Sequence, residues 1–393
     1  MHVRQEENNT YKEEYEKRHG MEPRSKVILR IGISLIIVYL LAIILPTNVF
    51  TGLGVQSIAQ CVEQVRLNVT RIFMALGGND TLDTQYIIFR YIAVGLTGAT
   101  LALCGAVYQG SFKNALASPS TLGVQSGGVL GGTIYILFFA SYGSNELMTS
   151  QDIHQQLVTM SVFERYAQGF AILAGCFLGV AFILSVSKIV GRGNLSSIAL
   201  ILSGTVFGSL ISGVVGIVQY WMLMNDPYGT GTYELRFMML GTFDRITSLE
   251  SLSILAIPLI VGMTVIILMR GKLNLLVFGE DEARSMGIRV ELTRNIMIGI
   301  VTILTAVVIS FCGQIGFVGF IVPHMARRFV GPDFRYLIPG SALLGAACMI
   351  FVYYVASVIG YSSNINVVTS LVGGTIFLVL IMRFRNRRNA DWA

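Results

Sequence analysis

The side chains that could do chemistry are concentrated in residues 278–345. This stretch reads FGEDEARSMGI, then an apolar span, then a glycine-rich run that ends in PHMARR. A short acidic and basic segment between two hydrophobic spans is suited to contact a soluble partner, because amphipathic segments bind in grooves on other proteins. The order of these segments predicts a docking surface connected directly to membrane helices. It favours a transport subunit driven from outside over an enzyme.

The sequence lacks the common motifs of nucleotide-binding and catalytic sites. No GxxxxGK[ST] run occurs, and Gly271-Lys272 is followed by Leu273, so the sequence contains no P-loop for ATP phosphates. Neither HExxH nor GxSxG occurs, and the four histidines are far apart. The apolar spans contain almost no ionisable residues, which a membrane enzyme or a proton-coupled carrier would need. We therefore expect no catalytic residues, no metal site and no cofactor bound by this chain.

The composition indicates the class of protein. Of the 393 residues, 53% are hydrophobic and 13% are charged, whereas about a quarter of the residues in a soluble domain are charged. So little polar surface predicts an all-α polytopic membrane protein. The five cysteines are scattered and form no CxxC motif, so we interpret them as packing residues and not as a disulfide framework.

Ten apolar stretches are candidate membrane spans, since roughly 20 residues cross a bilayer as a helix. They are residues 27–46, 87–108, 121–140, 166–187, 196–218, 251–269, 295–312, 314–326, 338–358 and 366–384. The eighth is short and glycine-rich, so we expect a partial or re-entrant helix that its neighbours shield from lipid. Residues 1–26 and 386–393 are expected to be tails on either side of a transmembrane domain over 27–385.

The distribution of basic residues predicts the orientation. With the N-terminus inside, 22 of the 28 lysines and arginines lie in inner segments and six lie in outer ones. Inner loops are rich in lysine and arginine, so we predict that both termini are cytoplasmic. The outer loops are then 47–86, 141–165 and 219–250. The aromatic content of the last loop predicts a short helix at the membrane interface, with Tyr220 and Trp221 at headgroup depth.

The predicted inner loop 271–294 contains the acidic run of the opening stretch. Acidic residues at 280–282 favour a helix that begins there, while Leu275, Val277 and Met286 could form an apolar face. A docking surface and an ordinary solvated loop are both compatible with this pattern.

A second unusual segment, residues 105–128, contains polar residues and Pro119 between two spans. Broken, polar backbone at membrane depth is tolerated where it lines a path. A plain turn between helices fits the residues equally well.

Four blocks carry a resemblance to a known family. They are Arg90 with the later run GLTGATLALCGAVYQGSFKNALASPSTLG, then Leu240-Gly241, then LNLLVFGEDEARSMGI, and finally GQIGFVGFIVPHMARRFVGPDFRYLIPGSALLGA. Over about residues 27–385 the chain resembles the FecCD permeases, the subunits of type II ABC importers for iron-siderophore, haem and vitamin B12 uptake. The resemblance implies ten helices and a dimer around a central path. It also implies two ATPase subunits inside, with ATP and magnesium bound in them, and a substrate-binding protein or lipoprotein outside.

The resemblance also implies roles for individual residues. The ATPase-coupling residues would be Leu273, Asn274, Leu275, Gly279, Glu280, Ala283, Met286 and Gly287. The cytoplasmic gate would consist of Asn114, Leu116, Leu195, Ser196 and Ser197. Arg90 would contact the binding protein at the outer mouth. The remaining residues that match the family's motifs are Gln109, Gly316, Gly319, Pro323, His324 and Arg327. The fifth and tenth helices would line the path.

Several residues depart from the family pattern. Tyr353 and Ser357 replace an aspartate and an arginine, and Ser362–Asn366 replaces Glu-Leu-Pro-x-Gly. The other departures are Ile87 for an arginine, Thr375 for a proline, and Asn114-Ala115-Leu116-Ala117 for Asn-Pro-Leu-Ala. Most of these changes fall at the predicted outer face, where docking and cargo chemistry would differ from those of other members.

The function expected from this resemblance is import of an iron(III)-siderophore chelate across the bacterial plasma membrane. Haem or a cobamide is the alternative cargo, and pairing with an identical copy or with a paralogue stays open. A membrane-embedded enzyme or an ion-driven carrier is the alternative class. Membrane lipid is an expected partner, and nucleic acid is not.

Overall fold

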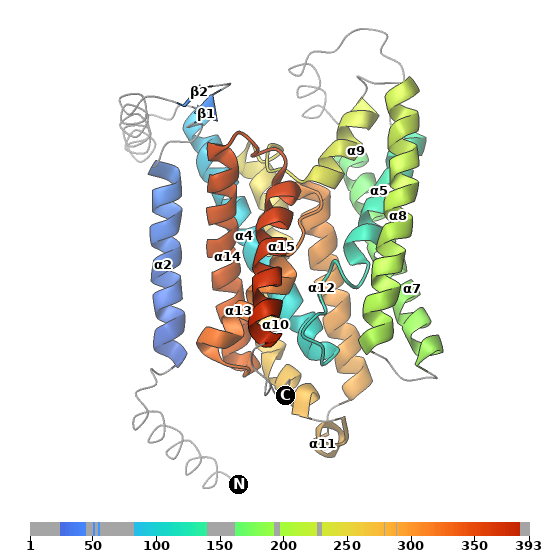
Figure 1. Cartoon of the computed structure of the whole chain (residues 1–393), viewed down its shortest axis with the longest axis vertical. Coiled ribbons are helices and arrows are strands. Elements are labelled where there is room, and N and C mark those ends of the chain that lie inside the picture. Colours follow the sequence, from blue (N-terminus) through green and yellow to red (C-terminus); the bar gives the residue numbers. More distant parts are fainter. Residues whose placement is uncertain are drawn as a thin grey trace.

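The computed structural model describes residues 24–44, 50–51, 54–55, 82–139, 162–191, 197–225, 230–278, 280–287 and 289–385. In these ranges the chain is helical apart from connecting turns and two short paired strands, β1 (Phe50–Thr51) and β2 (Gly54–Val55). The helices run side by side as a bundle (Figure 1). The predicted all-α fold class is confirmed for the described residues. Both predicted tails lie outside them, apart from the start of the first helix.

One long or medium helix corresponds to each predicted span. They are α2 (Arg24–Ile44), α4 (Leu82–Ser111), α5 (Val124–Phe139), α7 (Val162–Val190), α8 (Ser197–Asn225), α10 (Leu249–Phe278), α12 (Val290–Cys312), α13 (Val318–Val330), α14 (Phe334–Val358) and α15 (Ile365–Arg385). Among the described residues, six helices (α4, α7, α8, α10, α12 and α14) are long and apolar enough to cross a membrane. The apolar parts of α5 and α15 are shorter, and ten crossings stay a prediction. With 13 residues, α13 is too short to cross alone, which fits the predicted partial eighth helix.

Two short helices distinguish the ends of the bundle. Helix α9 (Thr230–Leu240) lies near one end, and α11 (Glu280–Ser285) lies at the other (Figure 1). We call these the α9 end and the α11 end. Among the described residues, several cations predicted to be cytoplasmic belong to helix segments that lead to the α11 end or to the turns there; they include Lys26, Lys188, Arg270, Lys272, Arg284, Arg289, Arg327, Arg328 and Arg335.

Helix α4 forms the centre of the packing. It contacts α2, α10, α12, α13 and α14, and its residues from Ala93 to Tyr108 are largely buried. Glycine allows the closest approach: a Cβ on Gly105 would overlap the carbonyl oxygen of Gly319 at the start of α13. Small residues let helix backbones meet in this way where dispersion, and not water exclusion, drives packing. The position of α13 against α4 therefore depends on this pair.

Several helix boundaries differ from the sequence prediction. Helix α10 continues to Phe278, so the first eight residues of the predicted loop 271–294 are helical. Its apolar pattern continues through Leu273 and Leu276, which are buried and therefore extend the helix past the membrane-spanning part. Helix α8 likewise continues to Asn225, so Tyr220 and Trp221 belong to it and not to an outer loop.

The predicted short helix within residues 219–250 is present as α9. Its Leu235 and Met238 are fully buried, and it contacts α5, α8, α12 and α15. The helix is therefore packed into the bundle and does not lie free on a surface. Most of the predicted outer loops 47–86 and 141–165 lies outside the described residues.

Candidate functional site

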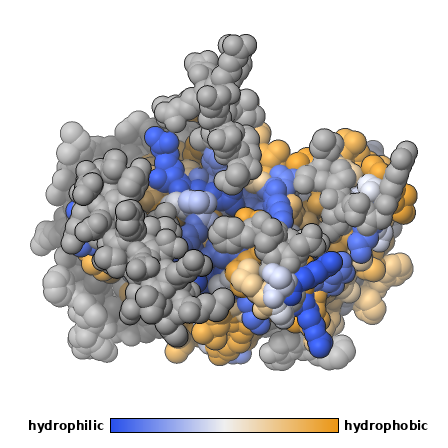
Figure 2. All heavy atoms as spheres, turned by 90° about the horizontal axis from the view of Figure 1, so that it is seen from below, coloured by the Kyte–Doolittle hydropathy of each residue, from blue (hydrophilic) through white to orange (hydrophobic). Residues whose placement is uncertain are grey.

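The predicted coupling segment projects beyond the other helices at the α11 end (Figure 1). Ala283 is buried and anchors α11 against α10 and α12. The next residues, 284–287, are exposed. Seen from this end, hydrophilic side chains gather across the middle of the described surface, with hydrophobic ones along its margin (Figure 2). The segment therefore combines a fixed base with an exposed, polar tip.

The predicted coupling residues divide between this base and this tip. Leu273 is buried and Leu275 is packed against the core, whereas Met286 is 53% exposed. Gly287 has a φ of +80°, a conformation that favours glycine, and it turns the chain after α11. The predicted helix start at the acidic run is confirmed, because α11 begins at Glu280. Gly279 and the side chain of Glu280 lie outside the described part.

Asn274 joins the end of α10 to the beginning of α14. Its Nδ2 donates to Asp333 Oδ1 at 2.7 Å, and its Oδ1 accepts from the backbone N–H of Phe334 at 2.8 Å. Asp333 is the N-cap of α14 and also accepts from the Arg335 N–H at 2.9 Å. The side chain of Asn274 is thus part of the cap that starts α14.

The polar segment that follows α4 is a compact turn at the α11 end. Asn114 accepts a 2.9 Å hydrogen bond from the Leu116 N–H, an Asx turn that leaves Leu116 38% exposed. At the end of α4, a Cβ on Gly110 would touch both Leu273 and the Phe334 ring. The end of α4, which leads to the predicted gate residue Asn114, is therefore in contact with the predicted coupling helix at Gly110. Leu195 and Ser196, and the side chain of Ser197, lie outside the described part.

Side-chain amides hold the glycine-rich segment between α12 and α13 together with the first turn of α13. Gln125 donates to the Ile315 carbonyl at 2.7 Å, and Gln109 donates to the Phe320 carbonyl at 3.2 Å. Asn366, at the start of α15, accepts from the Gly316 N–H at 3.0 Å and donates to the Met239 carbonyl at 2.9 Å. The segment is therefore fixed from α4, α5 and α15 together.

The remaining motif residues lie along α13. Gly319 is buried against α4, and Pro323 is buried inside the helix. Toward the α11 end, His324 and Arg327 are partly buried. The guanidinium of Arg327 is 5.9 Å from the centre of the Phe334 ring, within the range of a cation–π contact. These residues connect the short helix to the beginning of α14.

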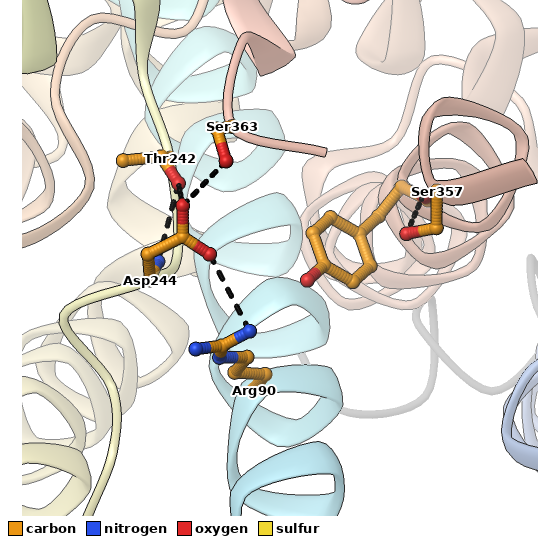
Figure 3. A network of polar contacts seen from close by, with 6 residues as sticks. Arg90, Thr242, Asp244, Ser357 and Ser363 are labelled. Atoms are coloured by element: carbon orange, nitrogen blue, oxygen red, sulfur yellow. Dashed lines mark hydrogen bonds and ion pairs between the residues drawn. The ribbon is translucent and has the colours of Figure 1, made fainter. Parts of the chain in front are cut away.

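A second polar cluster lies toward the α9 end (Figure 3). Arg90 on α4 pairs with Asp244, at 3.4 Å between Nη1 and Oδ1. Asp244 Oδ2 accepts from the hydroxyls of Thr242 at 2.7 Å and Ser363 at 2.6 Å. Tyr353 on α14 lies beside Arg90. The predicted docking arginine therefore has a carboxylate partner within its own chain.

Arg245, which follows Asp244 in the sequence, forms a second ion pair. It pairs with Glu234 on α9, whose side chain is only 2% exposed, and its guanidinium lies 3.5 Å from the centre of the Phe237 ring. Glu234 also accepts from Gln168 on α7 at 3.1 Å. The loop between α9 and α10 is thus held on both sides by adjacent residues of opposite charge.

Sequence reasoning did not identify the roles of Asp244, Glu234, Arg245, Ser363 and Asn366. The acidic residues of 219–250 were counted only as outer charges, because their partners are on other helices. The signal available in the sequence was the departure at Ser362–Asn366, which supplies two of these side chains. Within the described ranges, no group of three or more His, Cys, Asp or Glu side chains could hold a metal ion.

A sequence model of the FecCD transport family matches residues 51–383. The chain belongs to the FecCD transport family.

The names of known relatives of this FecCD permease refer to different cargoes. The cobalamin import permease of Halobacterium salinarum is 31% identical over 74% of this chain and 70% of its own length. The molybdate import permease of Haemophilus influenzae is 31% identical over 77% of this chain and 82% of its own. A Helicobacter pylori permease assigned to iron chelatin transport is 28% identical over 82% of this chain and 90% of its own length.

A solved structure also resembles this FecCD permease. It is described as an inward-facing conformation of an ABC transporter assigned to the metal-chelate type. The match has a TM-score of 0.65 and 25% sequence identity, and it covers 92% of this chain and 99% of the other. Fold and family therefore agree that the chain is a multi-pass ABC importer permease, a transport component.

Proposed function

We propose that this chain is the transmembrane subunit of an ATP-driven importer that carries an iron(III)-siderophore chelate across the plasma membrane into the cytoplasm. The observation that carries the proposal is the projecting α11, with its buried Ala283 and its exposed tip, in a FecCD permease without a P-loop. Energy from ATP then has to enter through contact with separate ATPase subunits, which shift the permease between conformations.

The ATPase subunits, with ATP and magnesium bound in them, would dock on residues 273–287. Buried Leu273 and Ala283 make the base of this segment stiff, so movement of the tip is passed on to α10 and α12. Contact at Gly110 would connect this movement to the gate residues Asn114 and Leu116. The charge asymmetry supports a cytoplasmic position for the α11 end and for both termini.

A second permease copy, identical or paralogous, would pack against α8 and α15. Only 17% of the α8 span is buried inside the chain, compared with 61% of the α4 span. Most exposed side chains on these two helices are apolar, among them Leu202, Val206, Leu210, Leu371 and Leu378, and the polar ones are Thr205, Ser209, Ser212, Asn225 and Thr375. Such a face is suited to a partner subunit and a path for bulky cargo, with membrane lipid around the rest.

The cargo proposed is a whole chelate. Support comes from the relative assigned to iron chelatin and from the structure assigned to the metal-chelate type. A haem or cobamide is the second candidate, favoured by the relative named for cobalamin. The exposed side chains of α8 carry hydroxyls that are satisfied by their own backbone, as at Ser209 and Ser212, and these are not strong ligands for a bare ion.

A substrate-binding protein that works with this permease would provide the test. It should be titrated with ferric siderophores, haem, cobalamin and molybdate, and transport of the best ligand should then be measured in vesicles with the ATPase. We expect submicromolar binding of a ferric siderophore and uptake only with ATP. Failure of every siderophore to bind would overturn the cargo proposal, and uptake without ATPase activity would overturn the importer mechanism.

A further inference from the structure

The Arg90–Asp244 pair can be reached from outside the chain. The side chains are 29% and 22% exposed, so neither charge is fully removed from solvent. Ser363, which also contacts Asp244, is exposed. A pair of this kind contributes little to stability, because solvent screens both charges. Replacement of Asp244 by another carboxylate as the partner of Arg90 would therefore change the stability of the permease little.

Arg90 has unused capacity to donate hydrogen bonds. Arginine presents five N–H donors, and its Nε is buried without a hydrogen-bond partner among the described residues. A carboxylate that reached the partly exposed end of the guanidinium could accept a charge-assisted hydrogen bond of ordinary length, which is stronger than the 3.4 Å contact made by Asp244. The guanidinium is thus only partly satisfied by its internal partner.

Packed aromatic rings lie beside this arginine. Tyr353, which lies near Arg90, packs edge-on against Tyr91 at 5.3 Å and against Phe243 at 5.6 Å between ring centres. All three rings are buried. Arg90 thus lies on a helix beside buried rings, whereas Asp244 lies in the loop between α9 and α10, and exchange at Arg90 would proceed by movement of Asp244.

Asp244 is attached to the beginning of α15. Its carboxylate accepts from Ser363 at 2.6 Å (Figure 3), and the Gly241 carbonyl accepts from the Ile365 N–H at 2.9 Å. Asn366 adds its hydrogen bond to the Met239 carbonyl. The end of α9, the following loop and the start of α15 therefore form one hydrogen-bonded unit, and the Arg90–Asp244 pair connects this unit to α4.

We propose that Asp244 is an internal competitor for Arg90, which an acidic side chain of the incoming substrate-binding protein replaces on the guanidinium. In the free permease Asp244 occupies the docking arginine and connects the α9–α15 unit to α4. On docking, the partner's carboxylate takes Arg90 and the unit is released from α4. The proposal rests on the proposed function and on the role that the family resemblance implies for Arg90, which is contact with the binding protein.

The test measures the affinity of the substrate-binding protein for the complete permease–ATPase complex in nanodiscs. Asp244→Asn removes the competing charge with little change of shape, and we expect binding to become about fivefold tighter, the size of one partly exposed ion pair. Glu250→Gln is the matched control, because it removes one exposed charge from the same end without touching Arg90. It should leave the affinity within about twofold. Equal gains in both variants would mean a general charge effect and would overturn the proposal.

Asp244→Asn made in an Arg90→Gln background distinguishes competition by Asp244 from docking at Arg90. We expect Arg90→Gln to weaken binding and Asp244→Asn then to have no further effect. If Arg90→Gln weakens binding but Asp244→Asn alone does not strengthen it, competition is wrong and docking stands. If Arg90→Gln has no effect, the docking role itself is wrong. Should Asp244→Asn fail to assemble, Ser363→Ala loosens Asp244 without removing its charge, and unchanged affinity there would equally contradict competition.

Discussion

Asn274 and Asp333 are joined side chain to side chain at 2.7 Å, although they are 59 residues apart in the sequence. The same amide accepts from the Phe334 N–H at 2.8 Å, so the end of α10 and the cap of α14 share one side chain. Helix α14 carries Tyr353, the neighbour of Arg90, near its other end. A single helix therefore connects the predicted coupling segment to the polar cluster at the α9 end.

Replacement of Asn274 by alanine should uncouple these two elements. Two hydrogen bonds are lost and the α14 cap is weakened, which should lower the free energy of unfolding by about 2 kcal/mol. We also expect less stimulation of the ATPase by the loaded binding protein. Thermal unfolding in detergent and ATPase assays check both effects. Asn295→Ala, on the exposed face of α12, is the matched control and should change neither; a normal, stimulated ATPase in Asn274→Ala would contradict the coupling role.

Reversal of the charge at Glu280 should weaken assembly with the ATPase. The residue begins α11, where a negative charge also suits the helix N-terminus, so lysine removes a favourable interaction of about 0.5 kcal/mol there and changes the docking surface. A pull-down of ATPase subunits with Glu280→Lys measures the loss. Glu250→Lys makes the same change in the first turn of α10, toward the α9 end, and should retain full association. Equal recovery of ATPase in both would count against docking at α11.

The contact between α4 and α13 should not tolerate a methyl group. In Gly105→Ala the new Cβ would meet the carbonyl oxygen of Gly319, and the helices would have to separate. Overpacking of this kind costs about 3 kcal/mol, so we expect a lower unfolding temperature and loss of transport. In Gly299→Ala, on α12, the Cβ meets nothing within 4 Å, and stability should be unchanged or slightly higher. Similar unfolding temperatures for the two variants would show that this contact is looser than described.

The buried pair Glu234–Arg245 should be important for stability. Glu234→Gln leaves Arg245 without its anionic partner at a carboxylate site that is 2% exposed, a loss of about 3 kcal/mol. Exposed Glu250→Gln should cost less than about 0.5 kcal/mol. Differential scanning fluorimetry of the two variants gives the comparison. A Glu234→Gln protein as stable as Glu250→Gln would mean that the neighbouring phenylalanine and Gln168 alone hold the loop.

The order and identity of the helices could be predicted from the sequence, because hydropathy is a property of consecutive residues. The short eighth helix and the helix start at Glu280 followed from glycine content and from acidic residues at a helix N-terminus. Boundaries were less accurate where an apolar pattern continued beyond the membrane, as at the end of α10. The short helix in residues 219–250 was expected at the membrane interface, but it is buried against four other helices.

The sequence by itself determined the class of protein and the succession of helices, and it predicted the orientation and the segment suited to an external ATPase. Each of these depends on composition, local periodicity or the sum of charges along the chain. Only the tertiary structure decided that Arg90 is paired with Asp244, that Asp244 contacts Ser363 across 119 residues, and that Asn274 caps α14. Ion pairs and hydrogen bonds depend on distances of a few ångströms between helices, and glycine contacts such as Gly105 with Gly319 set those distances.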